Sequence, residues 1–435
     1  MTSLVRSLRH RNFRLYFFGQ GISVTGTWMQ SVAMGWLAYR LTGSAALFGV
    51  VGFTGQILTF VIAPFAGVVA DRWDRRRLII VAQATALAQA LALAALTLAG
   101  VIEEDAPFAL PLLIGLSVFT GLVRGFEVPT RQSFMLQMLD EPDDLPNAIA
   151  LNSFLVNTAR LAGTLAAGYI VAWWNEGLCF LINGASYAAV IVALVAMRIA
   201  PRRIEAPKTD VLAGLKEGFR YAFGSPALRS ILLMLGITSL AGVPYIWLMT
   251  IFAKDVLGGG ADTLGHLMGA TGMGALAGAV FLASRKSVAR LGGMLRLAAI
   301  AFGAGLVAFG AVLLPFDAAK TGESCPWFIL WTGLVVLVWP GAAMMLQMSM
   351  SNTLLQTLSD EDKRGRVMSF YTVMFMGMIP FGNLLAGFVV GAVGAPLTVI
   401  LGGGVCILGA LVFGGRLPRR AEKVTPGVEE PGAAA

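Results

Sequence analysis

The chain has 435 residues, of which 57% are hydrophobic and only 13% are charged. Soluble domains usually have about 25% charged residues, so this composition excludes an ordinary soluble enzyme. The three cysteines, Cys179, Cys325 and Cys406, are too few and too widely spaced for a disulfide framework or a zinc site.

Twelve apolar stretches are long enough to cross a membrane, which takes about 20 mainly apolar residues. The first six are residues 13–37, 45–70, 78–101, 108–138, 148–173 and 178–197. The second six are residues 230–252, 264–283, 295–314, 327–350, 367–390 and 397–413. We therefore predict an all-α membrane protein of twelve transmembrane helices in two six-helix bundles.

The basic residues predict the orientation of these helices. If the N-terminus is cytoplasmic, the outward loops contain only Arg40, Lys254 and Lys320 among the 32 lysines and arginines. Cytoplasmic loops of membrane proteins carry the excess of positive charge, so both termini are predicted to be cytoplasmic. The net charge of +8 then reflects membrane topology, and we expect no nucleic-acid partner.

A polar, basic stretch separates the two sets of six spans. Within it Leu212, Leu215, Phe219 and Phe223 lie at helical spacing, which indicates an amphipathic helix at the membrane surface. The predicted organisation is an N-terminal bundle (residues 1–198), a cytoplasmic linker (199–229), a C-terminal bundle (230–415) and a disordered cytoplasmic tail (416–435).

Three short patterns of the first half recur at one constant spacing in the second half. Leu136-Gln-Met-Leu139 returns as Leu355-Gln-Thr-Leu358, Gly163 as Gly382, and Ala167-Gly168 as Ala386-Gly387. The spacing is close to half the chain length. It indicates a duplicated six-helix unit whose copies run in the same direction through the membrane.

Several charged motifs lie at the predicted cytoplasmic ends of the spans. They are Leu8-Arg-His-Arg-Asn-Phe-Arg14, Gly67-Val-Val-Ala-Asp-Arg-Trp-Asp-Arg-Arg-Arg77, Glu127-Val-Pro-Thr-Arg-Gln132 and Arg364-Gly-Arg-Val-Met-Ser369. With twelve spans and a central linker, they resemble the major facilitator superfamily. Within it they resemble the drug and siderophore exporters, a branch that includes the enterobactin exporter and macrolide-efflux proteins.

The resemblance implies a secondary active transporter of the inner membrane. It would export a small amphipathic molecule, a siderophore or a drug, by proton antiport with alternating access, as a monomer without a cofactor. An importer of a small organic solute and a non-transporting receptor or lipid-handling protein remain alternatives. The two histidines and scattered acids do not form the ligand clusters of a membrane-embedded enzyme or a metal site, so we expect no enzymatic activity.

A gating role is predicted for residues at the cytoplasmic ends of spans 2, 3, 4 and 11. Gly67 permits close helix packing, and Asp71 is expected to cap the N-terminus of span 11 and so hold the two halves together. By resemblance, this contact stabilises the outward-facing state. The full predicted set is Gly67, Asp71, Arg72, Arg75, Arg76, Glu127 and Arg366, with Arg75 expected to pair with Glu127.

Arg124, Glu127 and Arg131 lie on one face of span 4 and can pair along it. Ionisable groups within a membrane normally face a partner or an aqueous cavity. Glu127 is therefore the candidate proton carrier. Arg124 and Arg160 either contact an anionic substrate or form structural ion pairs.

A substrate cavity is expected between the two halves, lined by polar and aromatic side chains. The candidates are Gln20, Trp28, Gln30, Arg124, Arg160, Tyr245, Trp247, Trp339 and Gln347. For each of them ordinary packing is the alternative, because glutamines also bond across helices and tryptophans also mark membrane interfaces.

Overall fold

The computed structural model describes residues 3–104, 106–141, 144–199, 211–284, 291–316, 325–360 and 363–417. Within these ranges every regular element is a helix. The side chains of residues 63–72 lie outside the described part. So do the predicted tail from residue 418 onward and residues 200–210 of the linker.

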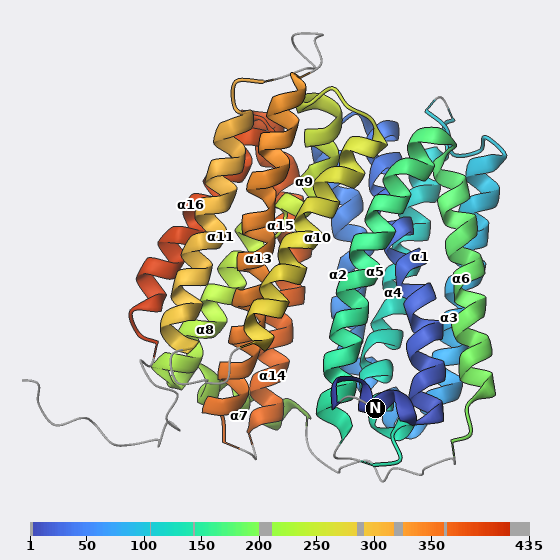
Figure 1. Cartoon of the computed structure of the whole chain (residues 1–435), viewed down its shortest axis with the longest axis vertical. Coiled ribbons are helices and arrows are strands. Elements are labelled where there is room, and N and C mark those ends of the chain that lie inside the picture. Colours follow the sequence, from blue (N-terminus) through green and yellow to red (C-terminus); the bar gives the residue numbers. More distant parts are fainter. Residues whose placement is uncertain are drawn as a thin grey trace, which may run out of the picture.

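The first half of the chain forms one helical bundle (Figure 1). Its elements are η1 (Ser3–Arg9), α1 (Arg11–Thr42), α2 (Ala45–Arg72), α3 (Arg75–Leu98), α4 (Ala109–Phe134), η2 (Met135–Met138), α5 (Leu145–Trp173) and α6 (Glu176–Ala196). Helix α1 packs against α5 and α6, α2 packs against α4, and α3 packs against α6. A buried apolar core runs through the bundle, so the helices of this half support one another.

The second half repeats this plan after the helix α7 (Val211–Gly224). Its continuous spans are α10 (Ala261–Ala283), α11 (Leu291–Leu313), α13 (Trp327–Leu358) and α16 (Ala395–Gly414). Two spans contain π-helical turns. The first consists of α8 (Pro226–Ile237), the π-helical turn η4 (Thr238–Gly242), α9 (Tyr245–Ile251) and the π-helical turn η5 (Phe252–Val256). The second consists of α14 (Arg364–Thr372), the π-helical turn η6 (Val373–Gly377) and α15 (Met378–Val393). π-Helical turns often mark functional sites.

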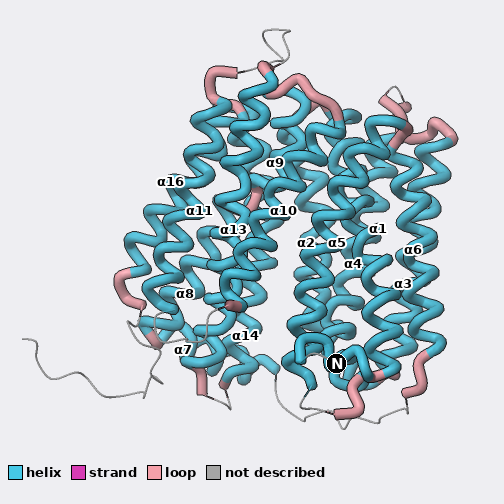
Figure 2. The backbone as a smooth tube through the Cα atoms, in the orientation of Figure 1, coloured by secondary structure: helices cyan, strands magenta, loops and turns pink. Residues whose placement is uncertain are grey.

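Eleven helices of the described chain are long and apolar enough to cross a membrane. The first predicted span, α1, falls outside this set although it has 32 residues and runs alongside the other spans (Figure 2). Polar side chains such as Gln20, Ser23 and Gln30 lower its mean hydropathy. Helix α1 can still run among the other spans because these side chains are buried inside the protein. The prediction of an all-α membrane protein is confirmed.

The two halves touch mainly along two helix pairs, α5 with α10 and α2 with α15. In the first pair a Cβ atom added to Gly168 would lie 2.7 Å from Cα of Gly265. In the second, a Cβ atom on Gly387 would lie 3.1 Å from Cα of Gly49. Gly168 and Gly387 are the equivalent positions of the predicted repeat, and the structure places both at the contact between halves.

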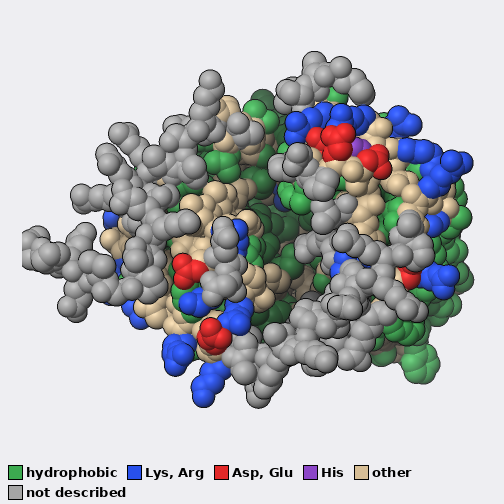
Figure 3. Space-filling view, turned by 90° about the horizontal axis from the view of Figure 1, so that it is seen from below, with side chains coloured by type: hydrophobic (Ala, Val, Ile, Leu, Met, Phe, Trp, Pro, Cys, Tyr) green, Lys and Arg blue, Asp and Glu red, His purple; other side chains and the backbone are tan. Residues whose placement is uncertain are grey.

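The halves separate toward one end of the molecule. We call the end that holds the N-terminus and α7 the inner end, and the opposite end the outer end (Figure 1). Viewed from the inner end, the surface is hollowed between the halves (Figure 3). The structure is therefore open between the halves at the inner end, whereas the glycine contacts of α5 with α10 and of α2 with α15 hold the halves together nearer the outer end.

Candidate functional site

Three of the predicted cavity residues come together midway along the helices. The guanidinium of Arg160 in α5 lies over the indole ring of Trp28 in α1, with 5.8 Å from Cζ to the ring centre. The same guanidinium interacts electrostatically with the phenol of Tyr245 in α9. Because α9 belongs to the second half, this group of residues bridges the two halves.

The glycine contacts between α5 and α10 place Arg160 beside the contact between the two halves. From the outer end inward, Gly168 meets Gly265, Leu165 meets Gly269, and Leu161 meets Gly272. The last of these contacts is looser, because a Cβ atom added to Gly272 would lie 3.6 Å from Leu161. Arg160 is therefore next to the innermost of these three contacts.

Side chains from both halves close the outer end above this site. Tyr39 of α1 donates a hydrogen bond to the carboxylate of Asp255 in η5. The hydroxyl of Tyr169 in α5 lies 2.8 Å from Nε2 of His266 in α10. We call these four residues the outer contact. Sequence reasoning missed it, because tyrosines near the ends of spans usually mark the membrane interface.

Trp247 also lies between the halves, nearer the outer end than the predicted cavity wall. Its ring stacks on Phe48 of α2 at 4.5 Å with an interplanar angle of 14°. Its indole Nε1 donates to the backbone carbonyl of Phe48 at 3.3 Å. Trp247 thus helps to hold the two halves together near the outer end, because its ring packs on Phe48 of the other half.

Two predicted cavity glutamines form hydrogen bonds within single halves. Gln30 donates to Gln89 of α3 at 3.1 Å and accepts from Asn183 of α6 at 2.6 Å. Gln347 donates to Thr238 at 2.7 Å inside the second half. These hydrogen bonds join neighbouring helices of the same bundle, and a place for either glutamine in the cavity stays a prediction.

Among the described residues, the remaining cavity candidates have no partner that assigns them a role. Gln20 is buried in α1, and Trp339 of α13 is 54% exposed. Arg124 of α4 is partly exposed, and among the described residues no hydrogen bond or ion pair involves it. Their place in a substrate cavity stays a prediction.

The pairing predicted along α4 is confirmed for two of its three residues. Nε of Arg131 lies 3.0 Å from Oε1 of Glu127, and Gln83 of α3 donates to the same oxygen at 3.4 Å. Glu127 is therefore held by donors from two helices of the first bundle. Its pairing with Arg75 stays a prediction.

The charged residues between α2 and α3 make structural contacts at the start of α3. Asp74 caps α3 by accepting from the backbone N–H of Arg77 at 2.8 Å, as short acidic side chains do at helix N-termini. Arg76 donates to the carbonyls of Leu194 and Val195 at the end of α6, both at 2.8 Å. Arg76 thus stabilises a helix C-terminus.

The other gating predictions have different outcomes. The side chains of Gly67, Asp71 and Arg72 lie outside the described residues. Arg366, at the start of α14, forms an ion pair of 2.6 Å with Glu217 of α7. Phe219 and Phe223 of α7 also pack against Phe370. The amphipathic helix α7 therefore packs against α14 of the second bundle.

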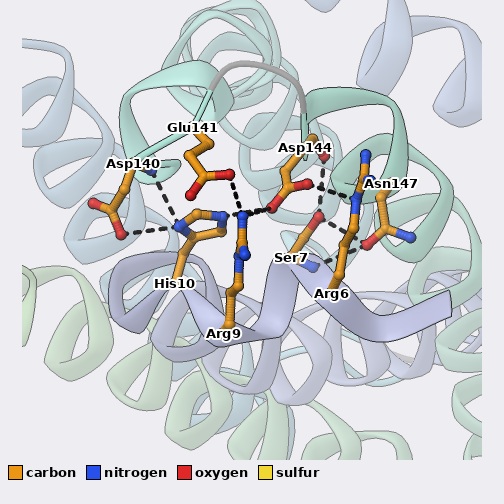
Figure 4. Close-up of polar contacts among 8 residues, drawn as sticks. All are labelled: Arg6, Ser7, Arg9, His10, Asp140, Glu141, Asp144 and Asn147. Carbon is orange, nitrogen blue, oxygen red and sulfur yellow. Dashed lines mark hydrogen bonds and ion pairs between the residues drawn. The ribbon is translucent and has the colours of Figure 1, made fainter. Parts of the chain in front are cut away.

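A polar cluster at the inner end ties the N-terminal helix η1 to the loop between α4 and α5 (Figure 4). We call it the inner cluster; it consists of Arg6, Ser7, Arg9, His10, Asp140, Glu141, Asp144 and Asn147. His10 is buried, with Nδ1 2.9 Å from Asp140 and Nε2 2.8 Å from Asp144. Ser7 Oγ lies 2.8 Å from the amide oxygen of Asn147. Sequence reasoning placed His10 in the cytosol without this partner set.

An equivalent contact exists in the second half. There the backbone N–H of Asp360, in the loop after α13, donates to the hydroxyl of Tyr221 in α7 at 3.1 Å. Nζ of Lys363 lies 4.8 Å from the centre of the Tyr221 ring. In both halves, the helix before the first span is therefore bound to the loop after the fourth span.

The inner cluster makes stability depend on pH. Burial alone would lower the pKa of His10, but the hydrogen bonds and charges of Asp140 and Asp144 outweigh it and raise that pKa above 6.5. The hydrogen bond from His10, aided by Arg6 and Arg9, outweighs burial and lowers the pKa of Asp144 below 3.8. The contribution of these two groups to the free energy of unfolding is thus full between about pH 3.8 and about pH 6.5. It is lost as pH rises through the pKa of His10 or falls through the pKa of Asp144.

We expect His10→Gln to lower the melting temperature by a few degrees at pH 6, with a much smaller loss at pH 9. The reason is that only the protonated imidazole donates to both carboxylates. Thermal unfolding of the purified protein across this pH range measures the effect. Arg11→Gln is the control, since Arg11 donates to the carbonyl of Ala196 outside the cluster. An equal loss at both pH values would contradict the assignment.

Comparison with known proteins identifies the family. The model of the family described as "Transmembrane secretion effector" matches residues 2–426. The staphyloferrin A transporter of Staphylococcus aureus (strain NCTC 8325 / PS 47) is 21% identical over 375 residues, covering 85% of this chain and 87% of the relative. The enterobactin exporter EntS of Shigella boydii serotype 4 (strain Sb227) is 24% identical over 413 residues, covering 93% and 90%.

Solved structures with low sequence identity share the fold. A D-xylose–proton symporter superposes with a TM-score of 0.72 at 14% identity, covering 94% of this chain and all of its own. A bacterial homologue of the iron transporter ferroportin, in an inward-facing state, gives 0.66 at 14% identity, covering 93% and 98%. Together with the two-bundle architecture, these matches show that the chain is a multi-pass membrane transporter, and that it belongs to the transmembrane secretion effector family of the major facilitator superfamily.

Proposed function

We propose that this transporter exports a small amphipathic molecule, a siderophore or a drug, across the inner membrane by proton antiport. Both termini are then cytoplasmic, the inner end faces the cytoplasm, and the protein acts as a monomer. The proposal is carried by the hollow at the inner end, together with the group of Arg160, Trp28 and Tyr245 that bridges the two halves.

The mechanism follows from the two contacts between halves. In the present state the outer contact is formed, and the surface between the halves is hollowed at the inner end. Export requires the outer contact to separate while the inner ends approach. The two interrupted spans of the second half provide π-helical turns at which a helix can bend.

Two lines of support favour a siderophore. Curated relatives that cover most of the chain are named as an enterobactin exporter and a staphyloferrin A transporter. A positively charged site also suits a substrate with acidic oxygens. The aromatic side chains Trp28 and Tyr245 suit a lipophilic drug equally well, so a multidrug exporter is the second candidate.

Proton coupling requires a group that is protonated in one state and paired in the other. Glu127 is the acid we propose for this role, because Arg131 and Gln83 hold it inside the first bundle. Deprotonated Glu127 is stabilised by Arg131 at its present distance. Proton uptake would weaken that ion pair.

Uptake into inside-out membrane vesicles tests the proposal. The substrates are a labelled catecholate siderophore and a labelled macrolide, each with and without a protonophore, and vesicles lacking the transporter are the control. Protonophore-sensitive accumulation of the siderophore is the expected result, and accumulation of the macrolide alone would favour the second candidate. Accumulation of neither substrate, or uptake only into right-side-out vesicles, would contradict export.

A further inference from the structure

Beside the contact between α5 and α10, two buried polar groups make no hydrogen bond of normal geometry to any described residue. They are Nε of Arg160, from the first half, and the hydroxyl of Tyr245, from the second half. Tyr245 is 1% exposed, and Phe302 packs edge-on against its ring with the centres 5.9 Å apart. Buried polar groups of native proteins are almost always hydrogen-bonded, so each of these two groups calls for an explanation.

One polar neighbour of the Tyr245 phenol is already engaged elsewhere. The hydroxyl of Thr271 lies close enough to influence the phenol, but it donates its own proton to the backbone carbonyl of Leu267 at 3.0 Å. The oxygen of Thr271 can still accept from the phenol, so a ligand oxygen would replace it as the acceptor of the Tyr245 O–H.

The charge of Arg160 is also uncompensated by the described residues around it. Its one hydrogen bond goes from Nη2 to the side-chain oxygen of Asn157 at 3.3 Å, and its ring contact is with Trp28. Both partners are neutral, and no described carboxylate lies within ion-pair distance of this arginine. A buried charge without a counter-ion is destabilising, which is a cost that a bound anion would remove.

We propose that Arg160 and Tyr245 together bind the carboxylate of an amphipathic organic acid. The planar guanidinium presents parallel N–H donors that match the two oxygens of a carboxylate. The phenol of Tyr245, which belongs to the second half, supplies a further O–H donor. Trp28, already stacked against Arg160, provides an apolar surface for the remainder of the ligand.

The placement also explains how such a ligand would be released. One donor belongs to α5 and the other to α9, so the pair is complete only while these helices stay together near the outer end. When the outer contact separates, the two donors move apart and the carboxylate loses one of them. The state that opens outward therefore binds the anion more weakly, as export requires.

This inference rests on the proposed function for the direction of release, whereas the binding site itself can be tested without transport. The probes are 2-naphthoate and 2-naphthamide, which have similar size and shape but differ in charge. Binding to the purified full-length protein is measured by titration calorimetry. We expect the wild type to bind naphthoate at least about tenfold more tightly, the usual effect of hydrogen bonds to a charged group.

The variants identify the residues responsible. Arg160→Gln should abolish the preference for naphthoate, Arg160→Lys should keep part of it, and Tyr245→Phe should weaken naphthoate binding several-fold without changing naphthamide binding. Arg296→Gln, which removes a positive charge from α11, is the matched control. Tyr245→Phe and Arg160→Lys are conservative changes, so they test the site even if Arg160→Gln fails to fold.

Three results would overturn the proposal: equal binding or no binding of the two probes by the wild type, an unchanged preference in Arg160→Gln, or loss of the preference in Arg124→Gln alone. The last would place the anion at Arg124. Vesicle uptake separates this inference from the proposed function. Anion binding without export would contradict the proposed export function but not the binding site. Export without the preference for naphthoate would contradict the binding site but not the export function.

Discussion

Replacing Gly168 with leucine should reduce uptake into inside-out vesicles about five- to 150-fold by preventing closure of the outer end. A Cβ atom at this position would lie 2.7 Å from Cα of Gly265 and 2.8 Å from the carbonyl oxygen of Ala261. These are backbone atoms, which cannot move without shifting α10. Overpacking costs about 1–3 kcal/mol, and a cost of that size changes the balance between the two states by this factor.

Cross-linking across the outer end measures the effect of Gly168→Leu on its closure directly. With the native cysteines replaced by alanine, the pair Tyr169→Cys and His266→Cys should react with a short bifunctional thiol reagent in the Gly168 background. Adding Gly168→Leu should suppress this cross-link. Gly404→Leu in α16 is the control, because a Cβ atom there has no neighbour within 4 Å. Wild-type uptake and cross-linking in Gly168→Leu would contradict the closed outer end.

Glu127→Ala should destabilise the protein by about 3–5 kcal/mol or somewhat less, the cost of leaving one member of a buried ion pair unpaired. Glu127 and Arg131 are 14% and 21% exposed at their side chains, so residual hydration reduces the effect. Replacing both residues by apolar ones, Glu127→Leu with Arg131→Met, should restore most of the loss. Denaturant unfolding in detergent measures all three proteins.

A milder change separates stability from proton coupling. Glu127→Gln keeps a polar side chain beside Gln83 but removes the titratable group. If Glu127 carries the proton, this variant should fold and yet lose accumulation driven by a pH gradient. Full gradient-driven uptake by Glu127→Gln would leave the residue a structural role only.

The spans could be predicted from sequence because apolar length is a local property. All twelve predicted stretches lie on helices of the structure, and the repeat correctly paired Gly168 with Gly387. Arg160 and Trp28 were also identifiable, since a charged or bulky polar side chain within a span needs a reason to be there. What the sequence conveys in these cases is the chemistry of single positions.

Pairings between distant positions could not be predicted in the same way. The partners of Gln30 lie on α3 and α6, which its neighbours in the sequence do not indicate. His10 and Asp144 are far apart in sequence, and nothing local shows that η1 folds onto the loop before α5. Tyr39 and Asp255 lie in opposite halves, so their contact depends on the conformational state of the transporter.

The central claim is that the site at Arg160 and Trp28 is exposed to one side of the membrane at a time. A single cysteine at position 28, in a cysteine-free background, tests it by its rate of labelling with a membrane-impermeant thiol reagent. We predict fast labelling in inside-out vesicles, slow labelling in right-side-out vesicles, and the reverse order when Gly168→Leu is added. Equal labelling from both sides, or an order that Gly168→Leu leaves unchanged, would contradict alternating access at this site.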